Sequence, residues 1–134
     1  MVKIKTRTVD KNKYKNYLIK TDQFLSSMRN ALAENNWNAV GLNAVHAVIS
    51  ANDALCVYYY GLRCLSEKHN DAGRLLVSLF NTKEAKEKST HLIWLINHKS
   101  LVEYDDRLFQ EKEALEAAKH TERFIDWVKS KIPG

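Results

Sequence analysis

The stretch WNAVGLNAVHAVISANDALCVYYYG, residues 37–61, decides the fold of this chain. Apolar residues occupy most sides of a helix drawn over residues 37–60, and a glycine follows at position 61, where many helices end. Small residues share one side of this helix and would let a neighbouring helix approach closely; they are Ala44, Ala47, Ala51 and Ala54. A helix that is apolar around most of its circumference is buried, so the stretch predicts the central helix of a bundle.

The rest of the 134 residues favours an all-α fold, an up-down bundle of four to five helices. The chain has only four glycines and one proline, and such a scarcity of helix breakers favours long helices over a turn-rich sheet. Helical periodicity predicts further helices over about 13–34 and 70–80. We expect Asn81 to cap a fourth helix that runs through Val102, and Asp105 or Asp106 to cap a fifth helix.

The apolar stripe of that fifth helix should comprise Leu108, Leu115, Ala118, Ile125 and Val128. No sheet is expected. Residues 2–9 alternate like a strand, but they have no obvious partner strand and are interpreted as irregular.

Basic residues are concentrated at the start of the chain. The first fifteen residues contain one acidic residue and six cations, namely Lys3, Lys5, Arg7, Lys11, Lys13 and Lys15, and these account for the formal net charge of +5. We interpret residues 1–12 as a basic flexible arm and residues 13–134 as a single domain. Such an arm can contact the phosphates of RNA without sequence preference, or it can be a solvated terminus.

A polar stripe interrupts the apolar central helix. Asn43, His46, Ser50 and Asp53 follow one another at spacings of three and four residues, which places all four on one face. Buried polar groups need hydrogen-bond partners. The stripe therefore predicts either a ladder of satisfied hydrogen bonds, for example across a symmetric subunit contact, or a polar wall beside a ligand cleft.

Several chemistries find no support in the sequence. His91 and His98 are seven residues apart, too far for two ligands of one zinc ion on a helix, so we expect a solvated charged face and no metal site. Cys56 and Cys64 are expected to be reduced thiols. The acidic cluster in VEYDDR, residues 102–107, is interpreted as helix capping. No phosphate-binding glycine loop occurs, and no cofactor is predicted.

A membrane location is also not expected. No apolar run is judged long enough to span a bilayer, and the lysine-rich N-terminus does not look like a signal peptide. The sequence therefore predicts a cytoplasmic protein.

Arg63 and His69 follow the end of the central helix and are the candidates for chemistry. An arginine can hold a phosphate with two hydrogen bonds, and a histidine can transfer a proton near neutral pH. Together they could cleave RNA without a metal ion. Alternatively, Arg63 interacts with the carbonyl groups at the end of the central helix and His69 is an ordinary loop residue.

The segment HAVISANDALCVYYYGLRCLSEKHNDAGRLL, residues 46–76, resembles the core of a HEPN-superfamily domain, in particular a small bacterial and archaeal branch. The later LVEYDDR, followed by a long alanine-containing helix, is similar to the same branch. The resemblance implies an all-helical bundle, often a homodimer. Active members carry an arginine and a histidine separated by four to six residues, and Arg63 and His69 are separated by five.

Two functions follow from the resemblance. The first is a protein that engages RNA or a nucleotide and could act as a metal-independent ribonuclease of a toxin–antitoxin or defence system. In that function Arg63 and His69 are catalytic, and Asp53 or His46 supports them. The second is a non-catalytic helper of a nucleotidyltransferase, with Arg63 and His69 structural. In active members the motif usually lies near the last helix, whereas here it follows the central one. A small-molecule sensor whose polar stripe lines a pocket is a third interpretation.

Overall fold

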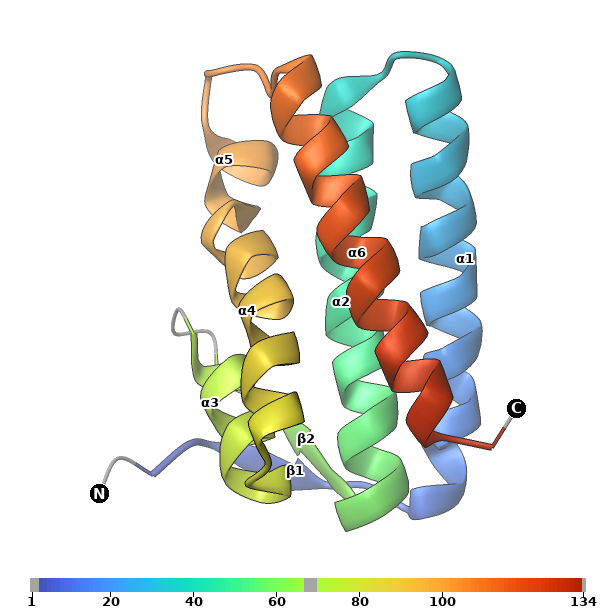
Figure 1. Ribbon diagram of the computed structural model, residues 1–134, viewed down its shortest axis with the longest axis vertical. Coiled ribbons are helices and arrows are strands. Elements are labelled where there is room, and N and C mark those ends of the chain that lie inside the picture. Colours follow the sequence, from blue (N-terminus) through green and yellow to red (C-terminus); the bar gives the residue numbers. More distant parts are fainter. Residues whose placement is uncertain (1–2, 67–69, 134) are drawn as a thin grey trace.

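The computed structural model describes residues 3–66 and 70–133, and it shows a helical bundle (Figure 1). Its long helices are α1 (Tyr14–Ala33), α2 (Trp37–Tyr60), α4 (Lys83–Asn97) and α6 (Glu111–Lys131). Shorter helices are η1 (Lys11–Lys13), α3 (Asp71–Phe80) and α5 (Lys99–Tyr104). The all-α fold class is thereby confirmed.

Helix α2 is the centre of the core, as its composition predicts. The four alanines on its small side are fully buried, and α1 and α6 pack closely against it (Figure 1). By length and by a mean hydropathy of 1.3, α2 could cross a membrane, so the expectation that no run is long enough is wrong. However, 78% of its apolar window is buried inside the bundle, as is usual for the core helix of a protein that does not span a membrane.

A two-stranded antiparallel ribbon joins the start of the chain to the end of α2. Strand β1 (Thr6–Thr8) pairs with β2 (Leu62–Cys64), with Arg7 opposite Arg63. The expectation that residues 2–9 are irregular is therefore wrong for Thr6–Thr8, and the expectation that no sheet forms is wrong. The partner strand is only three residues long, too short for an alternating pattern to be recognised, so sequence periodicity did not reveal it.

Gly61 makes this ribbon possible. It ends α2 in the left-handed conformation, with φ of 62°, and its carbonyl accepts a hydrogen bond from the backbone N–H of Val9 at 2.8 Å. A Cβ atom at position 61 would lie 3.1 Å from the carbonyl oxygen of Val9. The glycine therefore permits both the helix end and the close approach of the N-terminal segment.

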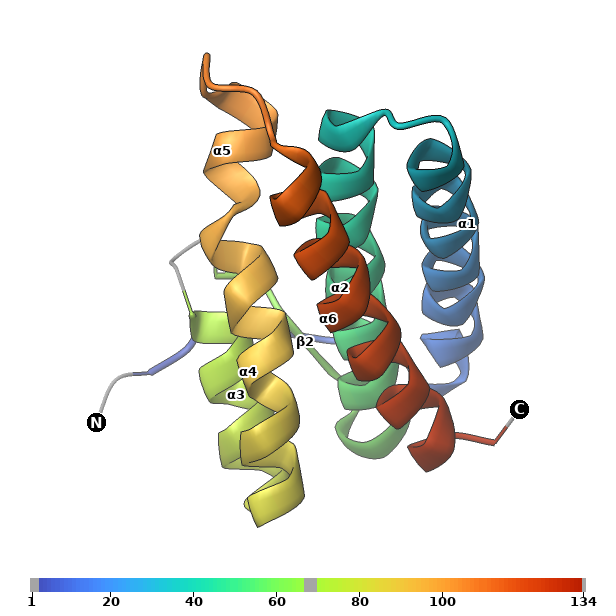
Figure 2. The same cartoon turned by 45° about the horizontal axis from the view of Figure 1, so that its top comes forward.

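The predicted fourth helix is divided in two at His98. The imidazole Nδ1 of His98 lies 2.7 Å from the carbonyl oxygen of Trp94, the atom that would accept the helical hydrogen bond of the His98 backbone. That backbone N–H bonds Leu95 O instead, and the chain continues as α5, beyond α4 in Figure 2. Asn81 does not cap α4: it ends α3 with positive φ, and the side chain of Thr82 caps α4 by accepting from Ala85 N.

The cap of the last helix is also not the predicted one. Asp105 ends α5, and α6 begins after Gln110, which forms a capping box with Glu113. Consequently Leu108 precedes the helix and is 66% exposed, and Leu115 is 53% exposed. The buried stripe of α6 contains the remaining predicted positions, Ala118, Ile125 and Val128.

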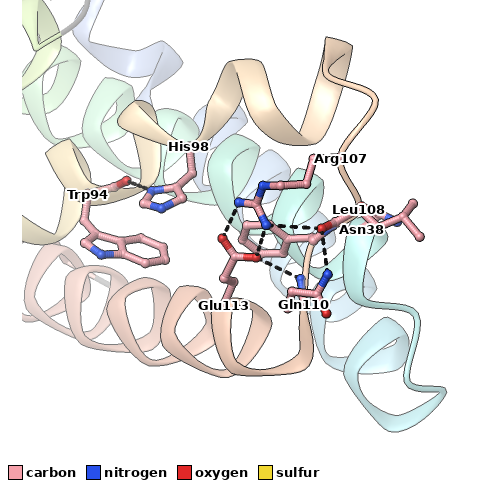
Figure 3. Close-up of polar contacts among 8 residues, drawn as sticks. Asn38, Trp94, His98, Arg107, Leu108, Gln110 and Glu113 are labelled. Carbon is pink, nitrogen blue, oxygen red and sulfur yellow. Dashed lines mark hydrogen bonds and ion pairs between the residues drawn. The ribbon is translucent and has the colours of Figure 1, made fainter.

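The loop before α6 is fixed by polar contacts that cross between elements (Figure 3). The Arg107 guanidinium binds both carboxylate oxygens of Glu113, at 3.0 and 2.7 Å, and the side chain of Asn38 on α2 accepts a hydrogen bond from Phe109 N. The hydrogen bonds from Arg107 lower the pKa of Glu113 to about 2, so this carboxylate stays ionised. These contacts give Arg107 and Glu113 a structural role.

Candidate functional site

Arg63 lies on β2 and turns toward the central helix. Its Nε donates to the carboxylate Oδ2 of Asp53 at 3.0 Å, and its guanidinium lies 5.9 Å from the centre of the Tyr17 ring on α1. The alternative in which Arg63 interacts with the carbonyl groups ending α2 is not what the structure shows. The arginine is instead held between a carboxylate and an aromatic ring, with a third of its side chain exposed.

Asp53 is almost completely buried on α2. Burial raises the pKa of its carboxyl group to about 6, and the hydrogen bond and charge of Arg63 act in the opposite direction. The side chain is only 6% exposed. Because a buried carboxylate is costly without a partner, the ion pair fixes the position of Arg63 and favours the ionised form of Asp53.

A pocket of about 330 Å³ opens beside this ion pair. Its walls come from α2, β2 and its following loop, α3, α4 and α5, and they comprise Ile49, Asn52, Asp53, Arg63, Cys64, Leu65, Ser66, Ala72, Ile96 and Lys99. Lys99 gives the pocket a second cation. Sequence analysis did not single out Lys99, because it stands 36 positions after Arg63 and only the packing of α5 brings it here.

The N-terminal strand adds a further cation. Arg7 is paired in register with Arg63, and residues directly opposite each other in a ribbon project from the same face. Arg7 is exposed, as are the other cations of this segment, Lys3, Lys5, Lys11, Lys13 and Lys15. Two arginines from segments more than fifty residues apart therefore share one face of the ribbon.

His69 lies outside the described residues, so its predicted proximity to Arg63 stays a prediction. The chain on either side of it is well anchored. Asp71, at the start of α3, accepts a hydrogen bond from Ser66 Oγ at 2.5 Å and another from Arg74 Nη1 at 2.9 Å. The side chain of Asp71 is 5% exposed, so these contacts hold the start of α3 against the end of the β2 segment.

The remaining members of the polar stripe have separate partners. Asn43 donates to the carbonyl oxygen of Ala39 on its own helix. The Nε2 of His46 lies 3.2 Å from a carboxylate oxygen of Glu103 on α5, and its ring lies against Phe24. Ser50 is buried. Within the described chain, only Asp53 of this stripe contacts Arg63, and Glu103 is a partner that sequence spacing could not reveal.

His91 and His98 do not lie on a solvated face. Each is partly buried between α4 and α6, where Nδ1 of His91 lies 2.8 Å from Nδ1 of His120 and the Trp94 ring stacks on both His98 and His120. Burial lowers the pKa of His91 and of His120. Residues 3–66 and 70–133 contain no group of three or more potential ligands placed to hold a metal ion.

Both cysteines are free thiols near the Arg63 pocket. Cys56 is buried on α2, and Cys64 is half-buried on β2. Burial raises the pKa of each thiol above its ordinary value, so both are protonated at neutral pH. Neither has the character of a nucleophile.

Comparison with known proteins places the chain in a family. The HEPN domain family matches residues 14–131, which include all the long helices and the Arg63 pocket. Searches of curated proteins and of solved structures give no significant match. HEPN domains are all-α and are generally associated with ribonuclease or nucleotide-related roles. Since the match covers most of the chain and agrees with the observed bundle, this protein belongs to the HEPN domain family.

Proposed function

We propose that the protein binds the phosphate groups of RNA or of a nucleotide at the face that carries Arg7 and Arg63. The observation that supports this most directly is their pairing in register. Like charges directly opposite each other destabilise a ribbon, and Asp53 can compensate only one of the two. A phosphate bound between the two guanidinium groups would relieve this repulsion and form charge-assisted hydrogen bonds with both.

The adjacent pocket supports the same proposal. Its volume of about 330 Å³ lies at the lower end of the range for small-molecule sites, and Lys99 contributes a cation to its wall. The Nε of Arg63 is occupied by Asp53, which leaves the two Nη groups for a ligand. Asp53 is thus proposed as a positioning residue, because it orients the guanidinium and does not touch the phosphate.

Cleavage of bound RNA is the finer part of the proposal and involves His69. This residue follows Ser66 of the pocket wall by three positions. His69 would take the proton of a ribose 2′-hydroxyl, whose oxygen attacks the phosphorus while the bond to the 5′-oxygen breaks and that oxygen receives a proton. Arg63 would stabilise the charge on the phosphorus centre, and the products would be a 2′,3′-cyclic phosphate and a 5′-hydroxyl.

Binding can be tested with a labelled single-stranded RNA titrated at several salt concentrations. We expect Arg7→Ala to weaken binding and to reduce the salt slope by about one unit, because one phosphate contact is lost. Arg63→Ala should weaken binding more strongly. Lys112→Ala, which removes an exposed cation at the other end of the bundle on α6, is the matched control and should leave the affinity nearly unchanged.

Cleavage is tested separately, in the presence of a chelator, with wild type and His69→Ala. We expect the wild type to produce cyclic phosphate ends and the variant to bind RNA without cutting it. Binding without cleavage by the wild type would instead favour the non-catalytic helper of a nucleotidyltransferase. If neither Arg7→Ala nor Arg63→Ala changes RNA binding in folded protein, the phosphate site is wrong.

A further inference from the structure

A second pocket, of about 410 Å³, is lined by residues at the ends of α2, α3 and α6 and at the start of α4. These helix termini lie at the same end of the bundle (Figure 1). The pocket walls are Tyr59, Tyr60, Phe80, Thr82, Glu84, Trp127 and Lys131. None of these residues lines the Arg63 pocket. Four of the seven are aromatic, an unusual concentration for the surface of a protein with 10% aromatic residues overall.

Hydrogen bonds and ring contacts hold the aromatic walls of this pocket in place. The hydroxyl of Tyr59 donates to the backbone carbonyl of Lys131, and that of Tyr60 donates to the carbonyl of Leu79 at 2.6 Å. Both rings also meet Phe80 edge to face, with centroids 5.4 and 5.3 Å apart. Tyr59 and Tyr60 nevertheless remain 41% and 43% exposed. Rings fixed in this way lose little conformational freedom when a ligand stacks on them.

Glu84 gives the pocket a hydrogen-bond acceptor. Its Oε1 accepts from the indole Nε1 of Trp127 at 2.5 Å and from the ammonium of Lys131 at 2.7 Å. The other carboxylate oxygen, Oε2, can accept from a donor on a ligand. Because Lys131 already neutralises the carboxylate, a second cation would gain little net attraction, whereas a neutral ring with an N–H group can still donate to Oε2.

We propose that this pocket binds an amino-substituted purine base, with the ring against Tyr59 and Tyr60 and the exocyclic amino group donating to Glu84 Oε2. Flat bases stack on aromatic side chains, and recognition of a base edge by a polar side chain adds selectivity. The site goes beyond the proposed phosphate site, since it needs neither Arg63 nor a phosphate group.

Adenosine tests the proposal, because it carries the amino group and lacks phosphate. Saturable binding should be measured by calorimetry and by the shift of the Trp127 indole N–H signal in the NMR spectrum. Tyr60→Ala should weaken binding by about 5- to 150-fold, the range for one lost stacking contact. Tyr60→Phe keeps the stacking ring but loses the hydrogen bond to Leu79 O, so it should weaken binding much less than Tyr60→Ala does. Tyr104→Ala, at an 81% exposed tyrosine on α5, is the matched control.

The role of Glu84 is tested with Glu84→Gln and with purine riboside, which lacks the amino group. Glu84→Gln should bind adenosine more weakly than the wild type does, and the wild type should bind purine riboside more weakly than adenosine. Glu84→Gln should not weaken the binding of purine riboside further, because the amino group that contacts Glu84 is absent from it. Arg63→Ala should leave adenosine binding unchanged, so failure of the phosphate site and failure of this pocket are distinguishable. The proposal is overturned if adenosine does not bind or if Tyr60→Ala has no effect on its binding. It is also overturned if the pocket binds a cationic probe, an amidated arginine derivative, instead of adenosine.

Discussion

Replacing Arg63 by methionine removes the partner of a buried carboxylate. Methionine keeps much of the length of the side chain and its packing on Tyr17, so the principal loss is the ion pair with Asp53. The carboxylate of Asp53 would then remain buried among apolar atoms of α2 with neither the hydrogen bond nor the charge of the guanidinium.

The cost of this change can be worked out from the environment of the pair. Breaking a fully buried ion pair costs about 3–5 kcal/mol. Arg63 is a third exposed, so water can reach the site and the cost should be smaller, about 2 kcal/mol above pH 7.5.

The cost should depend on pH in a defined direction. The pKa of Asp53 is about 6 in the folded protein, above the ordinary value of 3.8, and loss of Arg63 should raise it further. A raised pKa means that the folded state binds a proton more readily than the unfolded state does. The associated stability is therefore present below pH 3.8 and is lost as the pH rises through the folded pKa. Arg63→Met should cost about 2 kcal/mol at pH 8 and less than about 1 kcal/mol at pH 5.

Urea unfolding at pH 5 and pH 8, with wild type and variant compared at each pH, measures this difference. Comparison at equal pH cancels contributions from other titrating groups. Arg29→Met is the matched control, because Arg29 and Glu122 form an arginine–carboxylate pair at the surface, with side chains 58% and 35% exposed. This control should cost at most about 1 kcal/mol at either pH.

The double variant Asp53→Asn with Arg63→Met completes the test. It contains no carboxyl group at position 53, so its own stability should change less between pH 5 and pH 8 than that of Arg63→Met does. The reasoning is refuted if Arg63→Met costs the same at pH 5 and pH 8, or if it costs no more than Arg29→Met at pH 8.

Three further changes test other parts of the fold. Gly61→Ala should lower the free energy of unfolding by about 1–2 kcal/mol in urea titrations, because a side chain is strained at φ of 62° and its Cβ approaches Val9 O. Gln110→Ala should cost about 0.5–2 kcal/mol in the same assay through loss of the α6 cap, and an unchanged midpoint would contradict the capping role. Burial lowers the pKa of His91 and of His120, so the unfolded chain binds protons more readily than the folded one, and stability should fall as the pH drops below about 6.5. His91→Phe should reduce this fall, measured as the change of melting temperature with pH. An unchanged pH profile would contradict the buried environment assigned to His91.

The sequence by itself determined the helical architecture and the ends of α2. Local rules suffice for these features: the apolar circumference of residues 37–60 requires burial on most sides, and the glycine at position 61 ends the helix. The same local rules failed at the later caps. Segments 81–82 and 105–110 each contain several residues that could cap the following helix. Which residue does so depends on contacts such as that of Arg107 with Glu113, which form only when the loop is folded.

Only the tertiary structure decided the candidate site. Sequence spacing identified Arg63 and placed Asp53 on the polar face of α2, but it could not show that these two side chains meet. Nor could it show that Arg7 pairs with Arg63, because a three-residue strand has too little pattern to identify its partner. Lys99 reaches the pocket through the break at His98 and the packing of α5. Periodicity along a chain reports which residues are buried, whereas contacts between distant segments depend on how the buried faces pack together.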